Sequence, residues 1–143
     1  MLTGTQKPLL AIFTHPIAMS LLAVLVYGSW AAFTNMDHGF HAALMAGLGQ
    51  GAYAFVSTFT VTSLAQKSYS YFGAGVKGFL FSFIATFLVM LLIPLGIHSV
   101  LGTPDVLEAI SLGLIWGTGY ILFILWVAHS EFMRNRAVTT AGS

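Results

Sequence analysis

The chain has 143 residues, of which 57% are hydrophobic and only 6% are charged, whereas about 25% of the residues of a soluble domain are charged. Because so few charged residues cannot form the polar surface that a water-soluble protein needs, the composition predicts an integral multi-pass membrane protein. The net charge of +1 excludes a nucleic-acid partner, and the absence of cysteine excludes disulfides, thiolate metal sites and cysteine nucleophiles.

Four apolar runs are each long enough to cross a hydrocarbon core of about 30 Å. They cover residues 16–33, 42–64, 76–97 and 107–128. Odd and even positions are equally apolar in these runs, which argues against the alternating strands of a barrel. The apolar stretch that begins at Leu9 is too long for the core of a signal peptide, which favours a retained span. The predicted fold is therefore an all-α membrane protein, a single domain of residues 1–143 with four transmembrane helices.

Lysine and arginine fall on one side of these predicted spans. They are Lys7, Lys67, Lys77, Arg134 and Arg136. By the positive-inside rule, both termini and the loop between the second and third spans lie in the cytoplasm, and we expect a bacterial cytoplasmic membrane. That loop also carries Tyr69, Tyr71 and Phe72, which are suited to an anchor in the interfacial belt.

Helix-start signals precede three of the spans. Pro16 follows His15, and proline there either kinks the first span or occupies its first helical position. Before the second span, Asn35 is a good N-cap residue, and Asp37 would then lie in the first turn, near the positive end of the helix dipole. Thr103, Pro104 and Asp105 form the corresponding signal before the fourth span.

The helix-start signals before the second and fourth spans suggest a weak internal repeat. Placing Asn35 over Thr103 also superposes three pairs of glycines: Gly28 with Gly96, Gly49 with Gly117, and Gly51 with Gly119. The two helical hairpins would then be parallel repeats, related by an axis along the membrane normal.

Ionisable residues gather at the predicted outer ends of the helices. They are Asp37, His38, His41, His98, Asp105 and Glu108. His38 and His41 are three apart on a predicted helix and would share a face, so zinc binding or proton transfer is one interpretation. We favour the other interpretation, that these residues are caps and solvated groups, and we predict no cofactor. A metal site would use His38, His41, His98 and Asp105.

Haem is a second cofactor alternative. His15 and His129 near one membrane face, with His98 and His38 or His41 near the other, suit two bis-histidine haems. Ligating histidines normally lie inside the span, whereas His15 and His129 lie at its edge, so we disfavour haem.

Few polar side chains lie deep in the spans, and none is ionisable, which disfavours ion-coupled transport. Gln50 and Thr118 are the deepest, and Tyr53 and Ser57 continue from Gln50 at helical spacing. The predicted ligand-binding residues are Gln50, Tyr53, Ser57, Thr118, His38, His41 and His98. Hydrogen bonds between helices are the alternative use of the deep polar groups, and the spacings Gly47-x-x-x-Gly51 and Gly113-x-x-x-Gly117 indicate close helix packing.

Three functions fit this sequence, which contains no motif of a catalytic nucleophile or a nucleotide site and resembles no family we could match. We favour a small membrane protein that binds or moves a lipid or other apolar molecule, as a transporter or flippase-like unit or as an accessory subunit. One alternative is a membrane enzyme with a histidine and aspartate acid–base or metal site at the outer face. The other is a structural subunit of a larger membrane complex. The expected partners are membrane lipids and either a second copy of the chain or another membrane protein.

Overall fold

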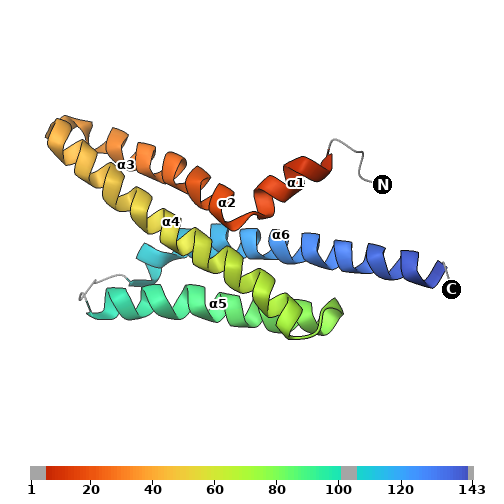
Figure 1. The fold of residues 1–143 in the computed structure, drawn as a ribbon. Coiled ribbons are helices and arrows are strands. Elements are labelled where there is room, and N and C mark those ends of the chain that lie inside the picture. The colour runs from red at the N-terminus through yellow and green to blue at the C-terminus, as the bar shows by residue number, and fades with distance from the viewer. Residues whose placement is uncertain (1–5, 101–105, 142–143) are drawn as a thin grey trace. The chain divides into compact units, whose positions relative to one another are not determined.

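The computed structural model describes residues 6–100 and 106–141, and every regular element among them is a helix, which confirms the all-α prediction. The chain divides into two compact units, Met1–Thr62 and Ser63–Ser143. Figure 1 follows the chain through both units. Whether the whole chain is a single domain stays a prediction.

The first unit begins with α1 (Gln6–Thr14) and a long helix in three segments. These segments are α2 (Pro16–Ala23), the π-helical turn η1 (Val24–Gly28) and α3 (Ser29–Thr34). His15 is the N-cap of α2 and Pro16 is in its first turn, so the proline starts a helix after a break. The His15 Nδ1 atom accepts the Ala18 N–H at 3.4 Å, which satisfies one of the amide groups at the helix start.

The turn after α3 differs from the prediction. Asn35 ends α3, and its side-chain amide donates to the Ala31 carbonyl at 2.8 Å, so it closes the preceding helix and does not cap the next one. Residues Met36–His38 form the 3-10 helix η2, and α4 (Phe40–Tyr71) starts only after Gly39, whose φ of 93° suits glycine. Asp37 therefore lies in η2, outside the first turn of α4, and the predicted N-cap with its dipole partner is wrong for this helix.

Glycines bring η1 and α3 close to the first part of α4 in antiparallel orientation (Figure 1). A Cβ atom on Gly28 would lie 3.0 Å from the Gly47 carbonyl oxygen, and one on Gly51 would lie 3.2 Å from Val24 Cγ1. Gly49 faces open space on another side of α4. Gly47 and Gly51 thus form the expected packing face, and they pack on the first span. Gly49 is not part of that face.

The second unit contains the end of α4, then α5 (Gly75–Val100) and α6 (Val106–Ala141). The turn between α4 and α5 uses Gly73 and Gly75, with φ of 84° and 81°, values that other residues rarely adopt. The α5 and α6 helices run antiparallel: the Phe79 ring meets the His129 ring, and Met90 lies against Gly117. The largest buried side chains of α6 are Ile121, Ile124 and Leu125.

The contacts between α5 and α6 also show which part of α6 lies beside the start of α5. Gly75, the first residue of α5, lies beside Phe132. The rest of α6 therefore extends beyond the start of α5, and all its described residues from Met133 to Ala141 are exposed. This extension carries Arg134, whose guanidinium lies 3.9 Å from the Glu131 carboxylate on the exposed surface.

Three helical segments of the described chain are long and apolar enough to cross a membrane. They are Pro16–Thr34, Gly75–Ile97 and Gly113–Ala141. These segments overlap the first, third and fourth predicted spans, as a membrane protein requires. The second predicted span, residues 42–64, lies within the continuous helix α4, which is not among the three because Gln50 and several hydroxyl residues lower its mean hydropathy.

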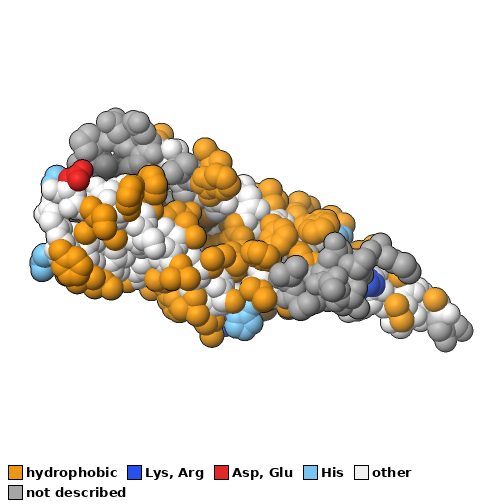
Figure 2. All heavy atoms as spheres, turned by 90° about the horizontal axis from the view of Figure 1, so that it is seen from above, with side chains coloured by type: hydrophobic (Ala, Val, Ile, Leu, Met, Phe, Trp, Pro, Cys, Tyr) orange, Lys and Arg blue, Asp and Glu red, His pale blue; other side chains and the backbone are white. Residues whose placement is uncertain are grey.

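The surface of the described residues also suits a lipid environment. Figure 2 shows hydrophobic side chains spread over the viewed face. Leu25, Trp30 and Trp116 have exposed fractions of 66%, 65% and 68%. Isolated exposed apolar residues are common in soluble proteins, but large aromatic and aliphatic groups exposed along whole helices indicate lipid contact.

Candidate functional site

The predicted ligand stripe lies along α4, beside the face that packs on α3. Gln50 and Tyr53 are both exposed, and no hydrogen bond is found for the Gln50 amide among the described residues. Ser57 is half-buried, and its hydroxyl donates to the Tyr53 carbonyl at 2.9 Å. The Ser57 hydroxyl is thus satisfied by its own helix, and Gln50 is the polar group of the stripe that has the most unused hydrogen-bonding capacity.

Thr118, the other deep polar residue of the prediction, lies on α6 in the second unit and is half-buried. The suggested correspondence of Thr118 with Gln50 stays a prediction, as does the internal repeat. Thr103 and Asp105 lie outside the described residues. Among the paired glycines, Gly28 is in close contact with Gly47, whereas no other part of the described chain comes within 4 Å of a Cβ placed on Gly96, so the described surroundings of this pair differ.

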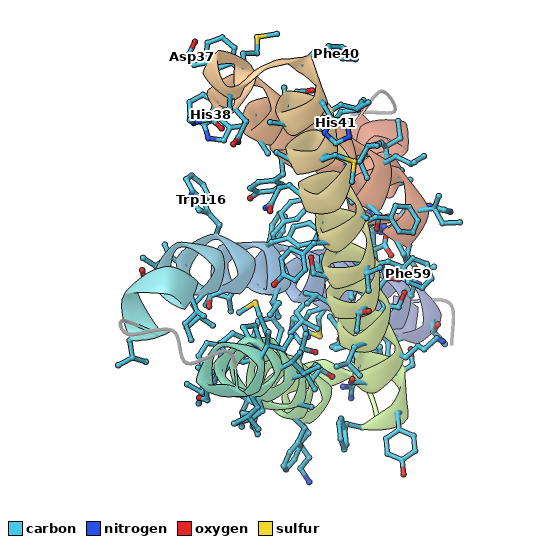
Figure 3. The ribbon with its side chains drawn as sticks, turned by 90° about the vertical axis from the view of Figure 1, so that its left-hand side faces the viewer. Asp37, His38, Phe40, His41, Phe59 and Trp116 are labelled. Atoms are coloured by element: carbon cyan, nitrogen blue, oxygen red, sulfur yellow. The ribbon has the colours of Figure 1, made fainter. Side chains whose placement is uncertain are left out.

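His38 and His41, two of the histidines predicted for the outer side, do not share a helix face. His38 is the last residue of the 3-10 helix η2, and His41 is in the first turn of α4. Gly39 lies between the two helices, so the helix is not continuous from His38 to His41. Figure 3 shows the two rings on different sides of α4, and both residues are exposed. The predicted shared face is therefore wrong, because it assumed one continuous helix from His38 to His41.

The proposed metal ligands are only partly described. Asp105 and the side chain of His98 lie outside the described part of the chain. Within that part, no three histidine, aspartate or glutamate side chains come together as a metal site would require. The zinc and haem alternatives are therefore not tested by this arrangement.

A polar cluster that the sequence did not predict joins α4, α5 and α6 within the second unit. Tyr69 is only 5% exposed, and its hydroxyl oxygen lies 3.2 Å from His129 Nδ1. The same oxygen accepts the Gly75 N–H at 3.0 Å. The His129 ring also makes edge contacts with the rings of Tyr69 and Phe79, at centroid distances of 6.4 and 6.1 Å. We call Tyr69, Gly75, Phe79 and His129 the turn cluster.

The Tyr69 hydroxyl oxygen accepts the Gly75 N–H and forms a second hydrogen bond with Nδ1 of His129, in which the tautomer of the imidazole ring decides which of the two groups donates. The cluster fastens α6 to the turn between α4 and α5. The predicted interfacial role of Tyr69 is wrong because its side chain is buried, whereas Tyr71, at 84% exposed, fits that role.

The sequence signal for this cluster is weak. Tyr69 and His129 are separated by 60 positions, and each looks like an ordinary amphipathic residue at a helix end. Gly78 is the better clue, because a Cβ there would lie 2.9 Å from the Tyr69 carbonyl oxygen, so a glycine marks the close approach of the two helices.

Comparison of the chain with protein-family models, with curated proteins and with solved structures gives no match.

Proposed function

We propose that this chain is a four-helix integral membrane protein that binds or moves a lipid or another apolar molecule, as a transporter or flippase-like unit or as an accessory subunit. The observation that carries the proposal is the Gln50 amide, which is exposed on an apolar helix without a hydrogen-bond partner in the described chain.

The contacts of α4 with the first span support a fourth membrane crossing. The Pro16–Thr34 segment is apolar enough to span, and Gly28 lies in its second half. Gly47 and Gly51 touch this segment at Ala32, Gly28 and Val24, in antiparallel order. A helix that lies side by side with a spanning helix occupies the same depth, so the first part of α4 also lies in the hydrocarbon region.

The same register supports a deep position for Gln50. Its neighbour Gly51 contacts Val24, which is near the middle of the first span. An amide in hydrocarbon without a hydrogen bond is costly, so a lipid-facing glutamine at this depth needs a partner. A hydroxyl or carbonyl group on an otherwise apolar molecule would satisfy Gln50, while the exposed apolar surface beside it contacts the rest of that molecule. Tyr53, one turn further along α4, can contribute a hydroxyl as a second polar contact beside the Gln50 amide.

A structural role in a larger complex is the second candidate, and Gly49 favours it. Gly49 is exposed, and a Cβ placed there has open space around it. A helix of another protein, or of a second copy, could approach closely at Gly49 and offer its own polar group to Gln50. The enzyme alternative has less support, because His38 and His41 do not share a face.

Lipid analysis of the purified protein distinguishes the two candidates. The chain would be extracted in mild detergent, and bound molecules would be identified by native mass spectrometry for the wild type and for Gln50→Leu. We expect a retained apolar molecule in the wild type and its loss in Gln50→Leu, with both proteins monodisperse. Gln66→Leu, the same change further along α4, is the control and should retain the molecule.

Two results would contradict the binding proposal. A wild-type protein without any retained molecule would argue against it, as would equal retention by the wild type and Gln50→Leu. If Gln50→Leu instead releases a bound protein subunit, the structural role is supported.

A further inference from the structure

Two lysines lie on either side of the turn between α4 and α5. Lys67 is in the last part of α4, Lys77 is in the first turn of α5, and both side chains are exposed. The sequence 40–100, which covers both helices and the turn, contains no aspartate or glutamate. The ion pair found among the described residues joins Glu131 to Arg134 on α6. Within the described chain, the charges of Lys67 and Lys77 are therefore not neutralised by an ion pair.

Three aromatic rings connect the two lysines. The rings of Tyr71 and Phe72 meet edge to face at a centroid distance of 5.2 Å, and the Phe72 ring lies 5.5 Å from the Phe81 ring. Tyr71 is one turn from Lys67 on α4, and Phe81 is one turn from Lys77 on α5, so each lysine shares a helix face with one end of the row of rings. We call these five residues the lysine–aromatic patch.

The lysine–aromatic patch lies at the end of a segment that can cross the membrane. The segment Gly75–Ile97 is long and apolar enough to span, so its first turn, which includes Lys77, is at the level of the lipid headgroups. A Cβ on Gly78 would lie 2.9 Å from the Tyr69 carbonyl oxygen, so the end of α4 is at the same level. Exposed aromatic rings and the charged ends of lysine side chains both favour this level of a bilayer.

An exposed apolar stripe continues from the patch along α5. It consists of Phe81, Ile84, Leu88 and Leu92. These positions follow Lys77 at steps of three and four residues, so the stripe and the lysine share one face of the helix. Phe79 and Met90, which contact α6, are on the opposite side of α5. The stripe therefore faces away from α6 and is available to the acyl chains of a lipid.

We propose that the lysine–aromatic patch binds the headgroup of an anionic phospholipid whose acyl chains lie along the exposed stripe of α5. The negative headgroup complements two lysines that have no acidic neighbour in α4 or α5, and the exposed Tyr71 hydroxyl can donate to a phosphate oxygen. Lysine and arginine near a membrane surface attract anionic lipids in this way. The site does not include Gln50, which belongs to the first unit, and it recognises a charged headgroup.

Competition between two lipids tests this assignment. The full chain would be purified in detergent and mixed with equal amounts of phosphatidylglycerol and phosphatidylcholine that carry the same acyl chains. Native mass spectrometry gives the ratio of the two lipids that stay bound. We expect the wild type to prefer phosphatidylglycerol, and Lys67→Gln and Lys77→Gln each to lower the ratio by about fivefold. Added salt should lower the ratio for the wild type as well, because it screens exposed charges.

Three further variants serve as controls. Arg136→Gln removes one positive charge, as each lysine variant does, but from the part of α6 that extends beyond the start of α5, and should keep the preference. Lys67→Arg combined with Lys77→Arg keeps both charges and should keep it too. Gln50→Leu should also keep it, so a failure of this assignment and a failure of the proposed function are distinguishable.

Three results overturn the assignment. The first is equal binding of the two lipids by the wild type, a measurement that depends on no variant. The second is an equal loss in Arg136→Gln, because net charge and not the patch would then be responsible. The third is displacement of phosphatidylglycerol by inorganic phosphate but not by chloride at the same ionic strength, because the lysines would then bind a free phosphate and not a lipid.

Discussion

The hydroxyl oxygen of Tyr69 lies 3.2 Å from Nδ1 of His129, on a chain where 60 positions separate the two residues. This bond links the end of α4 to α6, and the Gly75 N–H completes it at the start of α5. The buried Tyr69 hydroxyl thus connects α4, α5 and α6 through two hydrogen bonds. Hydrogen bonds at a buried polar group fix helix positions more specifically than apolar contacts do.

Tyr69→Phe should lower the stability of the chain. It removes the hydroxyl and leaves the Gly75 N–H and His129 Nδ1 without this partner, at a cost of about 1–3 kcal/mol. The unfolding temperature in detergent should fall by several degrees. Tyr71→Phe is the matched control, because Tyr71 is 84% exposed, and should change little. Equal effects of the two substitutions would show that the bond to His129 contributes nothing.

Gly28→Ala should destabilise the contact between η1 and α4. The new Cβ would lie 3.0 Å from the Gly47 carbonyl oxygen, and backbone cannot move aside as a flexible side chain can. Overpacking of this kind costs about 1–3 kcal/mol. Gly49→Ala is the control, since its Cβ has open space and alanine is a better helix former by about 1 kcal/mol. Thermal unfolding should therefore rank Gly49→Ala at or above the wild type and Gly28→Ala below it.

Gly117→Ala should disturb the contact between α5 and α6, because its Cβ would overlap the Met90 sulfur atom. The methionine side chain is flexible, so we expect a smaller loss than at Gly28, about 1 kcal/mol. Gly119→Ala, which has open space, is the control. Combining Gly117→Ala with Met90→Ala should restore part of the loss, and a strictly additive double variant would argue against this contact.

His15→Ala should weaken the start of α2. The histidine ring accepts the Ala18 N–H at a long distance of 3.4 Å, so the loss should lie near the lower end of the range for N-caps, about 0.5 kcal/mol. His15→Asn keeps a side-chain acceptor at the N-cap and should retain the stability of the wild type. Helix content and thermal unfolding of the two variants, measured side by side, provide the comparison.

Single cysteines can test the number of spans without interference, because the chain has no cysteine of its own. A fourth crossing by α4 places position 36 on one side of the membrane and position 71 on the other. We expect Met36→Cys and Ser99→Cys to react with a membrane-impermeant thiol reagent from outside intact cells. Tyr71→Cys and Thr140→Cys should react only after the cells are opened. Reaction of positions 36 and 71 from the same side would rule out the crossing by α4.

The all-α fold and three helices apolar enough to span were predictable from sequence, because hydropathy and backbone hydrogen bonding in lipid are properties of single segments. The sequence left two roles open for Pro16, a kink within the first span or the first position of a helix. The N-cap hydrogen bond of His15 shows that Pro16 begins a helix. The turn at residues 35–39 was predicted wrongly, since Asn35 can donate to the preceding helix as readily as it can cap the following one.

Only the tertiary structure decided which side of each helix meets a neighbour. Gly47, Gly49 and Gly51 look alike in sequence, but the rotation of α4 about its axis packs Gly47 and Gly51 against η1 and α3 and leaves Gly49 open. Likewise, Tyr69 and Tyr71 lie in one predicted loop, and the antiparallel register of α5 and α6 brings His129 to Tyr69 alone. Segment composition determines that a helix lies in the membrane, whereas helix rotation and register depend on contacts between residues far apart in the chain.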